Sequence, residues 1–483
     1  MSDKEFQHNK QGRDVFFCGI GGSGMLPLAV IVKARGGNVA GSDRALDQGR
    51  SAPKFEWLRA HGIEVFPQDG SGVTSGDQLF VASAAIEDSV CDVVRASELG
   101  CERRTRAALL AELFNASEHG IAVGGTSGKS TVTGMIGWVL AELGRDPTIM
   151  NGAVMTNFVD VYAPASTGLS TGFASARVGG GDLFVSEVDE SDGSIALFRP
   201  EIAVINNISL DHKSIDELRA LFGGFAVTAQ RSVYNADDGE TRKLIESLDL
   251  DRPVSFGLTE DADYRAEAIA ERPLSIGFDL RHPGGYVPVQ LAVPGKHNVA
   301  NALAAIAACA VLGVDMADAA RAIGGFTGLA RRFELVGTAN GVTVIDDFAH
   351  NPDKVAATLA TLKAFPGRVI AFFQPHGYGP LRQMGDVLAQ SFAGGMGPDD
   401  LLIVSDPAYY GGTVDRSVGS DAFVAQVVAS GAHAKHIAER AACGDHIATI
   451  ARPGDRIVVM GARDDTLSQF ARDILAGAAQ PKT

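Results

Sequence analysis

The sequence predicts an α/β protein of three domains, and three observations support this prediction. The chain has 483 residues, more than one hydrophobic core usually serves, and a domain size of about 150 residues gives three domains. Two apolar segments run directly into glycine-rich turns that open helices, at residues 19–24 and 124–131. The last part of the chain alternates apolar runs with helical stretches, which is typical of a parallel sheet covered by helices. We expect the domains at residues 1–115, 116–328 and 329–483.

The first domain is expected to be Rossmann-like, because a buried strand leads into the turn Gly19-Ile-Gly-Gly-Ser-Gly24 and a helix follows. The first, third and last residues of this turn match the Gly-x-Gly-x-x-Gly template, and Asp43 supplies an acidic residue roughly twenty positions later. Such a turn brings backbone N–H groups to a diphosphate, which can belong to NAD or to a nucleotide sugar. The pattern leaves both open, and Asp43 could also act only by stabilising its own turn.

The second domain begins with the most informative segment, Gly124-Gly-Thr-Ser-Gly-Lys-Ser-Thr131. A strand, a glycine turn, a lysine and hydroxyls at a helix start together wrap backbone N–H groups around phosphates. The usual phosphate-loop pattern has four residues between its first glycine and the Gly-Lys pair, whereas this loop has three. The shortened loop indicates a narrower group of ATP users than NTPases in general. A glycine turn with a chance lysine is the alternative.

The second domain is therefore predicted to be a P-loop-type ATP-binding α/β domain. Lys129 would reach the terminal phosphates, and Ser130 would bind Mg²⁺. The residues expected to contact ATP in this segment are Gly125, Thr126, Ser127, Gly128, Lys129, Ser130 and Thr131.

Polar residues follow the next apolar strands of this domain. The acidic stretch 187–192 follows one strand, and residues 206–212, which end in Asp-His, follow another. Because the carboxyl ends of parallel strands meet at one edge of a sheet, we expect both stretches near the phosphate loop. Two alternatives remain open: the acidic stretch could be a solvated loop, and a lone histidine such as His212 is more often structural.

The third domain is predicted to be a Rossmann-like α/β domain. Apolar strands are expected at residues 342–345, 369–373, 401–404 and 457–460, with helical stretches between them. Polar side chains follow these strands, which places candidate ligand contacts at the carboxyl edge of a parallel sheet.

Composition excludes several classes of protein. Lys and Arg number 42 and Asp and Glu number 58, and the resulting net charge of −16 argues against a general nucleic-acid binder. Five scattered cysteines without a CxxC pair fit a reducing compartment rather than a disulfide framework or zinc site. We find no signal peptide and no apolar run long enough to span a membrane. We therefore expect a cytoplasmic protein, either a monomer or a homodimer, that does not bind membranes.

The order of these motifs resembles the Mur ligase family, the ATP-dependent amide-forming enzymes of peptidoglycan synthesis, and in particular its branch that acts on UDP-N-acetylmuramate. The resemblance extends over nearly the whole chain, because the motifs occur in the order of the family. The matching motifs are Gly19-Ile-Gly-Gly-Ser-Gly-Met25, Gly125-Thr-Ser-Gly-Lys-Ser130, Glu187-Val-Asp-Glu-Ser-Asp192, Asp211-His212, His297-Asn-Val-Ala-Asn301, Arg331-Arg-Phe-Glu334, Asp346-Asp-Phe-Ala-His350 and Gln374-Pro-His376.

The resemblance implies a two-step ligase reaction. A carboxylate of UDP-N-acetylmuramate attacks the γ-phosphate of ATP, which gives an acyl phosphate and ADP, and an amine then displaces phosphate to form an amide. In-line phosphoryl transfer depends mainly on positioning and on neutralising charge. The acceptor implied by default is L-alanine, and the implied cofactors are ATP and Mg²⁺.

The family's functional residues carry over to matching positions of this chain. The implied catalytic residues are Lys129, Glu187, His212 and His350, and the implied Mg²⁺ ligands are Ser130, Glu187 and His212. The implied ATP contacts outside the loop are Asn298, Asn301, Arg332 and Asp347. The implied substrate contacts are Gly21, Gly22, Ser23, Gly24, Ser42, Asp43, His376 and Arg382. Mg²⁺ prefers oxygen ligands, so the assignment of His212 depends on the resemblance alone, and Asn298 could be only a helix cap.

The chain departs from the family pattern at three positions. Ser127 stands where the family has a histidine in the phosphate loop. The loop should tolerate this change, because it binds phosphate through backbone N–H groups. Gly377 and Pro380 stand where the alanine-adding enzymes have arginines, and Arg382 remains. The loss of two forked carboxylate donors should weaken or redirect recognition of the amino acceptor.

Three other functions compete with an alanine-adding ligase. A recycling ligase would attach a whole tripeptide to the same sugar nucleotide, and a larger acceptor would tolerate the missing arginines. A nicotinamide-dependent oxidoreductase would use the first glycine turn but leaves the phosphate loop unexplained. A catalytically silent relative could act as a binding partner, although Lys129, Glu187 and His212 are all retained.

Overall fold

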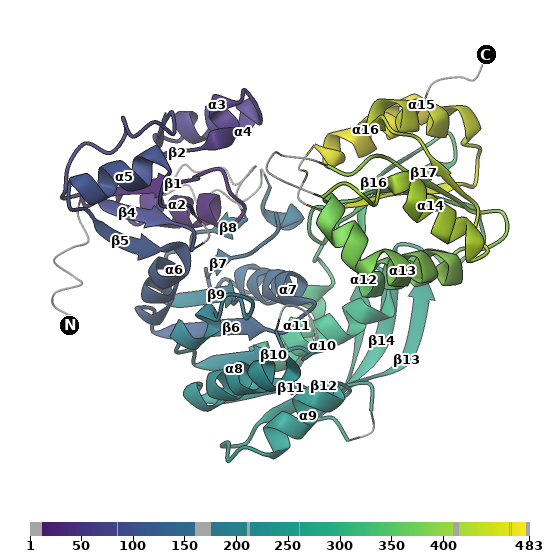
Figure 1. The fold of residues 1–483 in the computed structure, drawn as a ribbon. Helices are drawn as coiled ribbons and strands as arrows, with labels where there is room; N and C mark the ends of the chain where they lie inside the picture. Colours follow the sequence, from purple (N-terminus) through teal and green to yellow (C-terminus); the bar gives the residue numbers. More distant parts are fainter. Residues whose placement is uncertain are drawn as a thin grey trace. The chain divides into compact units, whose positions relative to one another are not determined.

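The computed structural model describes residues 12–84, 86–159, 175–209, 213–259, 261–408, 415–462, 464 and 466–479. The chain forms two compact units (Figure 1). Unit 1 consists of Met1–Ala270, Ile276–Val293 and Asn298–Thr327, and it carries the first two sheets. Unit 2 consists of Glu271–Ser275, Pro294–His297 and Gly328–Thr483, and it carries the third sheet.

The first sheet has five strands in the order β3-β2-β1-β4-β5, and all of its pairings are parallel. This is the strand order of a Rossmann half-fold. The strands are β1 Asp14–Cys18, β2 Asn38–Ser42, β3 Glu64–Phe66, β4 Leu79–Ala82 and β5 Glu102–Thr105. The helices are α2 Met25–Ala34, α3 Arg44–Asp47, α4 Ala52–Ala60, α5 Cys91–Glu98 and α6 Arg106–Asn115.

Both faces of this sheet are buried, as the continuous apolar run of β1 requires. Successive side chains of a strand point to opposite faces. Phe17 accordingly packs in a cluster with residues of α2, whereas Phe16 packs in another with Val93 and Ala96 of α5. β1 is therefore fixed between two helical layers, and the glycine turn starts at its carboxyl end.

The second sheet has ten strands in the order β15-β14-β13-β12-β11-β10-β6-β9-β7-β8. Its strands are β6 His119–Gly124, β7 Thr148–Met150, β8 Ala176–Arg177, β9 Leu183–Glu187, β10 Ile202–Ile205, β11 Arg231–Asn235, β12 Val254–Gly257, β13 Tyr264–Arg272, β14 Ser275–His282 and β15 Gly285–Leu291. Its helices are α7 Lys129–Glu142, α8 Ile215–Thr228, α9 Gly239–Glu246, α10 Lys296–Val311 and α11 Met316–Ile323, with 3₁₀ turns η1 Thr156–Phe158 and η2 Ser194–Leu197. β8 pairs antiparallel with β7, and β15 with β14.

The register at the centre of this sheet determines where the site lies. Val123 of β6 pairs with Glu187 of β9, and Gly124 pairs with Ile205 of β10. These three parallel strands therefore end side by side, and the segments that follow them start at one edge, where open α/β sheets bind ligands.

The third sheet has six strands in the order β16-β17-β21-β18-β19-β20. Its strands are β16 Glu334–Ala339, β17 Val342–Asp347, β18 Val369–Gln374, β19 Leu401–Val404, β20 Ala434–His436 and β21 Arg456–Gly461. Its helices are α12 Pro352–Lys363, α13 Tyr378–Gly395, α14 Ser420–Ala429, α15 Arg440–Ile450 and α16 Leu467–Ala479.

The third sheet has an additional edge strand, β16, which was not among the predicted strands and which runs antiparallel to β17. The reason is the two-residue connection between them, Asn340 and Gly341, whose φ angles are +48° and +75°. Asn-Gly with two positive φ angles is the preferred hairpin turn, because its twist matches that of the paired strands. The other strands of this sheet pair in parallel, and the predicted α/β fold class is confirmed.

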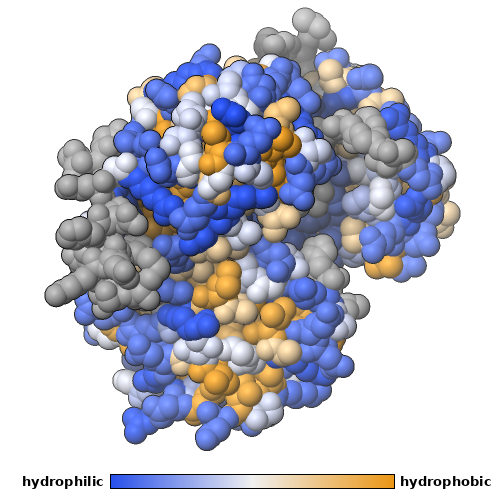
Figure 2. All heavy atoms as spheres, turned by 60° about the vertical axis from the view of Figure 1, so that its left-hand side comes forward, coloured by the Kyte–Doolittle hydropathy of each residue, from blue (hydrophilic) through white to orange (hydrophobic). Residues whose placement is uncertain are grey.

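The surface visible in Figure 2 is mostly hydrophilic, with hydrophobic residues in small groups between polar ones. Single exposed apolar side chains are normal on folded proteins. Among the helices of the described part of the chain, none has the length and apolar character needed to cross a bilayer.

Candidate active site

The phosphate loop joins β6 to α7, and two of its glycines adopt backbone conformations that other residues avoid. Gly125 has a φ of +138°, and Gly128, which caps the N-terminus of α7, has a φ of +83°. A Cβ atom on Gly128 would lie 2.3 Å from Nδ2 of Asn206 and 2.7 Å from Oδ1 of Asn301. Glycine is therefore required here for both its conformation and its small size.

Residues 206–209, which follow β10, stabilise this loop through side-chain hydrogen bonds. Nδ2 of Asn206 donates to the Ser127 carbonyl at 2.8 Å. Oδ1 of Asn207 accepts from the Thr126 hydroxyl and from the Ser127 N–H, both at 2.8 Å. The Thr126 hydroxyl also lies 2.7 Å from the Ser209 hydroxyl. The loop is held in shape by side chains of the neighbouring strand end, so its binding conformation is preorganised.

Lys129 is the first residue of α7, and its ammonium group is held by two partners. Nζ donates to the Gly125 carbonyl at 2.6 Å and to both carboxylate oxygens of Glu190, at 2.8 and 3.1 Å. Glu190 is only 5% exposed. The acidic stretch is therefore not simply a solvated loop, because Glu190 is buried against the lysine of the phosphate loop.

Ser130 and Glu187 form a hydrogen-bonded pair of oxygen-bearing side chains beside Lys129. The Ser130 hydroxyl donates to Oε2 of Glu187 at 2.6 Å, and Nδ2 of Asn151 donates to the Ser130 carbonyl at 2.9 Å. A Cβ atom on Gly152 would lie 2.1 Å from Oε1 of Glu187, so this carboxylate packs against bare backbone.

This pair fits a magnesium ion, which proteins usually bind through one or two oxygen side chains together with substrate phosphates. Among the described residues no group of three or more His, Cys, Asp or Glu side chains forms a closed metal site. His212, the third predicted ligand, lies outside the described residues.

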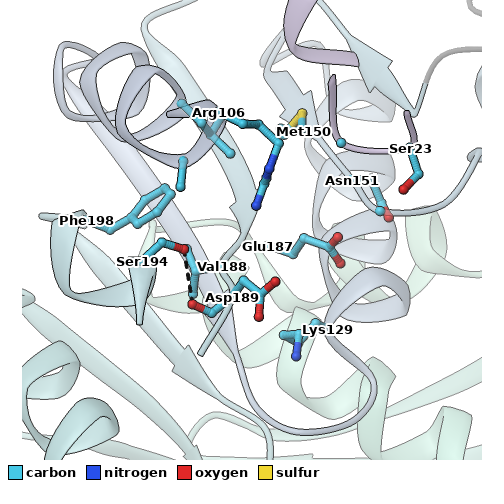
Figure 3. Close-up of a pocket in the computed structure, with 14 residues that line it drawn as sticks. Ser23, Arg106, Lys129, Met150, Asn151, Glu187, Val188, Asp189, Ser194 and Phe198 are labelled. Atoms are coloured by element: carbon cyan, nitrogen blue, oxygen red, sulfur yellow. Dashed lines mark hydrogen bonds between the residues drawn. The ribbon is translucent and has the colours of Figure 1, made fainter. Parts of the chain in front are cut away.

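A cavity of about 290 Å³ opens beside these residues (Figure 3). Residues of the first glycine turn, of the phosphate-loop helix and of the β9 end all contribute to its wall. The lining residues are Ser23, Gly24, Arg106, Ala107, Leu110, Lys129, Met150, Asn151, Gly152, Glu187, Val188, Asp189, Ser194 and Phe198. The structure thus brings Ser23 and Gly24 of the predicted substrate-binding turn to one cavity within unit 1 with Lys129 and Glu187.

Asp43 stabilises the first glycine turn directly. Its Oδ2 accepts from the Gly21 N–H and its Oδ1 from the Ala45 N–H, both at 2.8 Å. Ser42 has no exposed surface, and its hydroxyl donates to Asp92, which is also fully buried. The side chain of Ser42 is therefore directed into the core, while Gly22, Ser23 and Gly24 remain at the turn.

The two asparagines of α10 lie next to the phosphate loop. Nδ2 of Asn301 donates to Oδ1 of Asn298 at 3.1 Å, and Oδ1 of Asn301 accepts from Asn206 at 3.4 Å. Both α10 asparagines are buried. Asn298 is the third residue of the helix and bonds within it rather than acting only as a cap.

Unit 2 groups several predicted residues at the carboxyl ends of β17 and β18. The guanidinium of Arg332 lies 4.5 Å from the Phe348 ring centroid, and its positive charge acts on both Asp347 and His350. Burial raises the pKa of Asp347, although a hydrogen bond from Thr358 and the charge of Arg332 oppose the shift. The rings of His350 and His376 pack edge to face, with their centroids 5.0 Å apart.

His350 gives unit 2 a pH-dependent stability. The pKa of His350 is lowered to about 3, mainly because the ring is buried and also because the positive charge of Lys354 is close. A hydrogen bond between Nδ1 of His350 and the Phe348 carbonyl opposes this shift. Between pH 6.5 and 3 the unfolded chain binds a proton here that the folded chain does not, so stability rises with pH and is fully present above pH 6.5.

We therefore expect the free energy of unfolding of unit 2 to fall by about 2 kcal/mol from pH 7.5 to pH 5 through this histidine. Urea unfolding at both pH values should show a smaller loss for His350→Gln than for the wild type. An equal loss in the variant would contradict the assignment of this effect to His350.

The structure does not bring Arg382 to this group. Its guanidinium donates to Asp415 at 2.5 Å, and its side chain is 49% exposed. Gly377 caps α13 with a φ of +138°, where an arginine would be strained, and Pro380 lies in the first turn of that helix. The backbone at Gly377 is thus adapted to glycine and not to the arginine that the resemblance implies.

Sequence reasoning missed several residues of the unit 1 site. Asn206 and Asn207 carried a signal, because they directly follow a strand at the ligand edge. Glu190 carried only the ambiguous signal of an acidic stretch. Asn151 and Arg106 carried none, because no motif contains them and only the tertiary fold brings them to the cavity.

The fold and the site define a class: a multi-domain α/β protein with a shortened phosphate loop at the carboxyl edge of its central sheet. Models of three Mur ligase domains match the chain, the family's catalytic domain at residues 14–118, its middle domain at 123–309 and its glutamate ligase domain at 331–463. The UDP-N-acetylmuramate–L-alanine ligase of Streptomyces coelicolor is 36% identical, over 78% of this chain and 80% of its own. The chain belongs to the Mur ligase family.

Solved structures agree with this membership. A UDP-N-acetylmuramate-alanine ligase from Thermotoga maritima has a TM-score of 0.77 at 25% identity, and the match covers 96% of this chain and 98% of that one. A murein peptide ligase from Psychrobacter arcticus shares the fold, with a TM-score of 0.68 at 24% identity and coverage of 98% and 100%.

The predicted three-domain fold is therefore confirmed, while its boundaries at residues 115 and 328 stay predictions. The chain is an ATP-dependent ligase that forms C–N bonds in peptidoglycan synthesis, and the oxidoreductase interpretation of the first glycine turn is not supported.

Proposed function

We propose that this chain joins UDP-N-acetylmuramate to L-alanine through an acyl phosphate. The observation that carries the proposal is the cavity lined both by the turn at Ser23 and Gly24 and by Lys129 and Glu187. A sugar nucleotide whose diphosphate lies at the turn would extend its carboxylate toward a γ-phosphate held by Lys129. The names of the relatives from Streptomyces coelicolor and Thermotoga maritima support these substrates.

Each residue of the unit 1 site has a role in this reaction. Lys129 would exchange Glu190 for the β- and γ-phosphates, and the braced loop would present its N–H groups to them. Ser130 and Glu187 would hold Mg²⁺, which, when bound, neutralises phosphate charge. Asn298 and Asn301 would read the adenine edge. By resemblance, His212 would hold a second Mg²⁺, and Arg332, Asp347 and His350 would contact ATP.

Residues of the first glycine turn would bind the sugar nucleotide. Ser23 and Gly24 would bind the diphosphate through their backbone N–H groups. Gly21 and Gly22 would shape the turn instead, because their N–H groups donate to Asp43 and to the Gly19 carbonyl. His376 and Arg382 remain candidates for the acceptor side by resemblance. With ATP and a nucleotide sugar as substrates, the reaction would take place in the cytoplasm.

An acceptor screen tests this proposal. Phosphate release is measured with ATP, Mg²⁺ and UDP-N-acetylmuramate, with L-alanine, glycine, L-serine or the cell-wall tripeptide as the amine. We expect turnover that requires all components and is fastest with L-alanine. Turnover with the tripeptide and none with L-alanine would instead identify a recycling ligase, whose larger acceptor would tolerate glycine and proline at positions 377 and 380.

A further inference from the structure

Arg106 enters the cavity from the first domain and has no role in the assignments above. It is the first residue of α6, where the Thr105 hydroxyl caps the helix by accepting from the Ala108 N–H at 3.1 Å. Its side chain lines the cavity and is 24% exposed. Figure 3 shows it reaching from its helix toward the segment of Glu187 and Asp189, with Lys129 beyond them.

The guanidinium group of Arg106 is only loosely paired. Its one ion pair is with Asp192, whose Oδ2 lies 3.8 Å from Nη2, and within the described part of the chain it makes no hydrogen bond. Burial raises the pKa of Asp189, but hydrogen bonds from Ser191 and the charges of Lys129 and Arg106 outweigh burial and lower it. Arg106 thus adds positive potential to the cavity while its donors stay available to a ligand.

The glycine turn leaves room for this side chain. A Cβ atom on Gly24 would lie 3.0 Å from Cδ and 3.3 Å from Nη1 of Arg106. The absence of a side chain at Gly24 therefore lets the arginine pass along the turn into the cavity. The same turn is the expected diphosphate site, so Arg106 lies between that site and the residues predicted to bind ATP.

A substrate carboxylate in this cavity would require a cation to offset the negative charges of the cavity wall. Glu187 and Asp189 both line it, so a substrate carboxylate that enters meets two negative groups. Lys129 is paired with Glu190 and, in the reaction, is assigned to the phosphates of ATP. Arg106 is the remaining cation among the lining residues, and a planar guanidinium matches a carboxylate with two parallel hydrogen bonds.

We propose that Arg106 binds the carboxylate of the sugar-nucleotide substrate and positions it for attack on the γ-phosphate. This inference depends on the proposed function, because it takes the lactyl carboxylate of UDP-N-acetylmuramate as the ligand. The carboxylate oxygen forms the new bond to phosphorus and ADP leaves with the electron pair, while Arg106 stays bound to the acyl group through its N–H donors.

Binding of two nucleotide sugars without ATP tests the proposal. UDP-N-acetylglucosamine has the diphosphate and sugar of UDP-N-acetylmuramate but lacks the lactyl carboxylate. Calorimetry on Arg106→Ala should show affinity for UDP-N-acetylmuramate reduced by about 10- to 100-fold, with affinity for UDP-N-acetylglucosamine changed less than about 2-fold. Arg106→Lys should be intermediate, because lysine keeps the charge but loses the fork.

Arg104→Ala is the matched control, since Arg104 lies in the same segment, is exposed and pairs with Glu102 outside the cavity. Equal losses for both nucleotide sugars in Arg106→Ala would overturn the proposal and assign Arg106 to the diphosphate. Unchanged affinity for both would overturn it as well. Equal wild-type affinity for the two nucleotide sugars would also overturn it, because the carboxylate would then add no affinity. The proposed function fails separately, if the wild type forms no amide from UDP-N-acetylmuramate in the acceptor screen, so the two failures are distinguishable.

Discussion

Replacement of Lys129 with alanine should lower kcat for ATP-dependent phosphate release by about 10³-fold, the scale of losing a cation that stabilises phosphoryl transfer. The lysine lies at the start of α7, and its ammonium is already positioned by the Gly125 carbonyl and Glu190. Because phosphoryl transfer is catalysed mainly by positioning and charge neutralisation, no other described side chain of the loop can replace it. Steady-state phosphate release with saturating substrates measures the effect.

The ion pair with Glu190 requires a control for stability. Lys129→Ala leaves the buried Glu190 carboxylate without its cation, which should lower the free energy of unfolding by about 2 kcal/mol, reduced from the fully buried case because Lys129 keeps 21% of its side chain exposed. In the double variant with Glu190→Gln the stability should recover while activity stays low. Recovery of activity in the double variant would show that the single variant merely misfolds.

Replacement of Gly128 with alanine should be the most damaging change of a single small residue in the loop. The backbone there has a φ of +83°, and the new Cβ would lie 2.3 Å from the buried amide of Asn206. The left-handed conformation and the overlap together should cost about 3 kcal/mol of stability, and ATP affinity should fall by more than about 10-fold because the loop must move. Urea unfolding and nucleotide titration measure the two effects.

Gly144→Ala is the matched control for this variant. Gly144 has a similar φ of +73°, but a Cβ there would meet nothing within 4 Å. It should therefore lose only the conformational part, about 1 kcal/mol, and keep its ATP affinity. Equal destabilisation by the two variants would contradict the contact between Gly128 and Asn206.

Local segments with several agreeing signals were predictable from the sequence. The strand, turn and helix at β1 and α2 follow from an apolar run, a glycine turn and a second apolar run, and the predicted helix matches Met25–Ala34. The phosphate loop is equally local, because its glycines, lysine and hydroxyls lie within eight consecutive positions. The edge at which Glu187 and residues 206–209 meet follows from the rule for parallel strands.

Long-range pairings were not predictable, because no local pattern encodes them. Lys129 and Glu190 lie 61 positions apart, and only the insertion of β9 beside β6 brings them together. The position of Arg106 in the cavity depends on the contacts that α6 makes with η2, and α2 with β8, within unit 1. The antiparallel strands β14 and β15 alternate buried and exposed residues, a weaker signal than the continuous apolar runs of the parallel strands.

The most direct measurement follows oxygen from substrate to product. UDP-N-acetylmuramate labelled with ¹⁸O in its lactyl carboxylate is incubated with ATP, Mg²⁺, the accepted amine and the enzyme, and the released phosphate is examined by mass spectrometry. An acyl phosphate formed in the cavity between the first glycine turn and Lys129 requires one ¹⁸O atom to appear in each phosphate. Release of unlabelled phosphate at the full rate of amide formation would contradict carboxylate attack on the γ-phosphate.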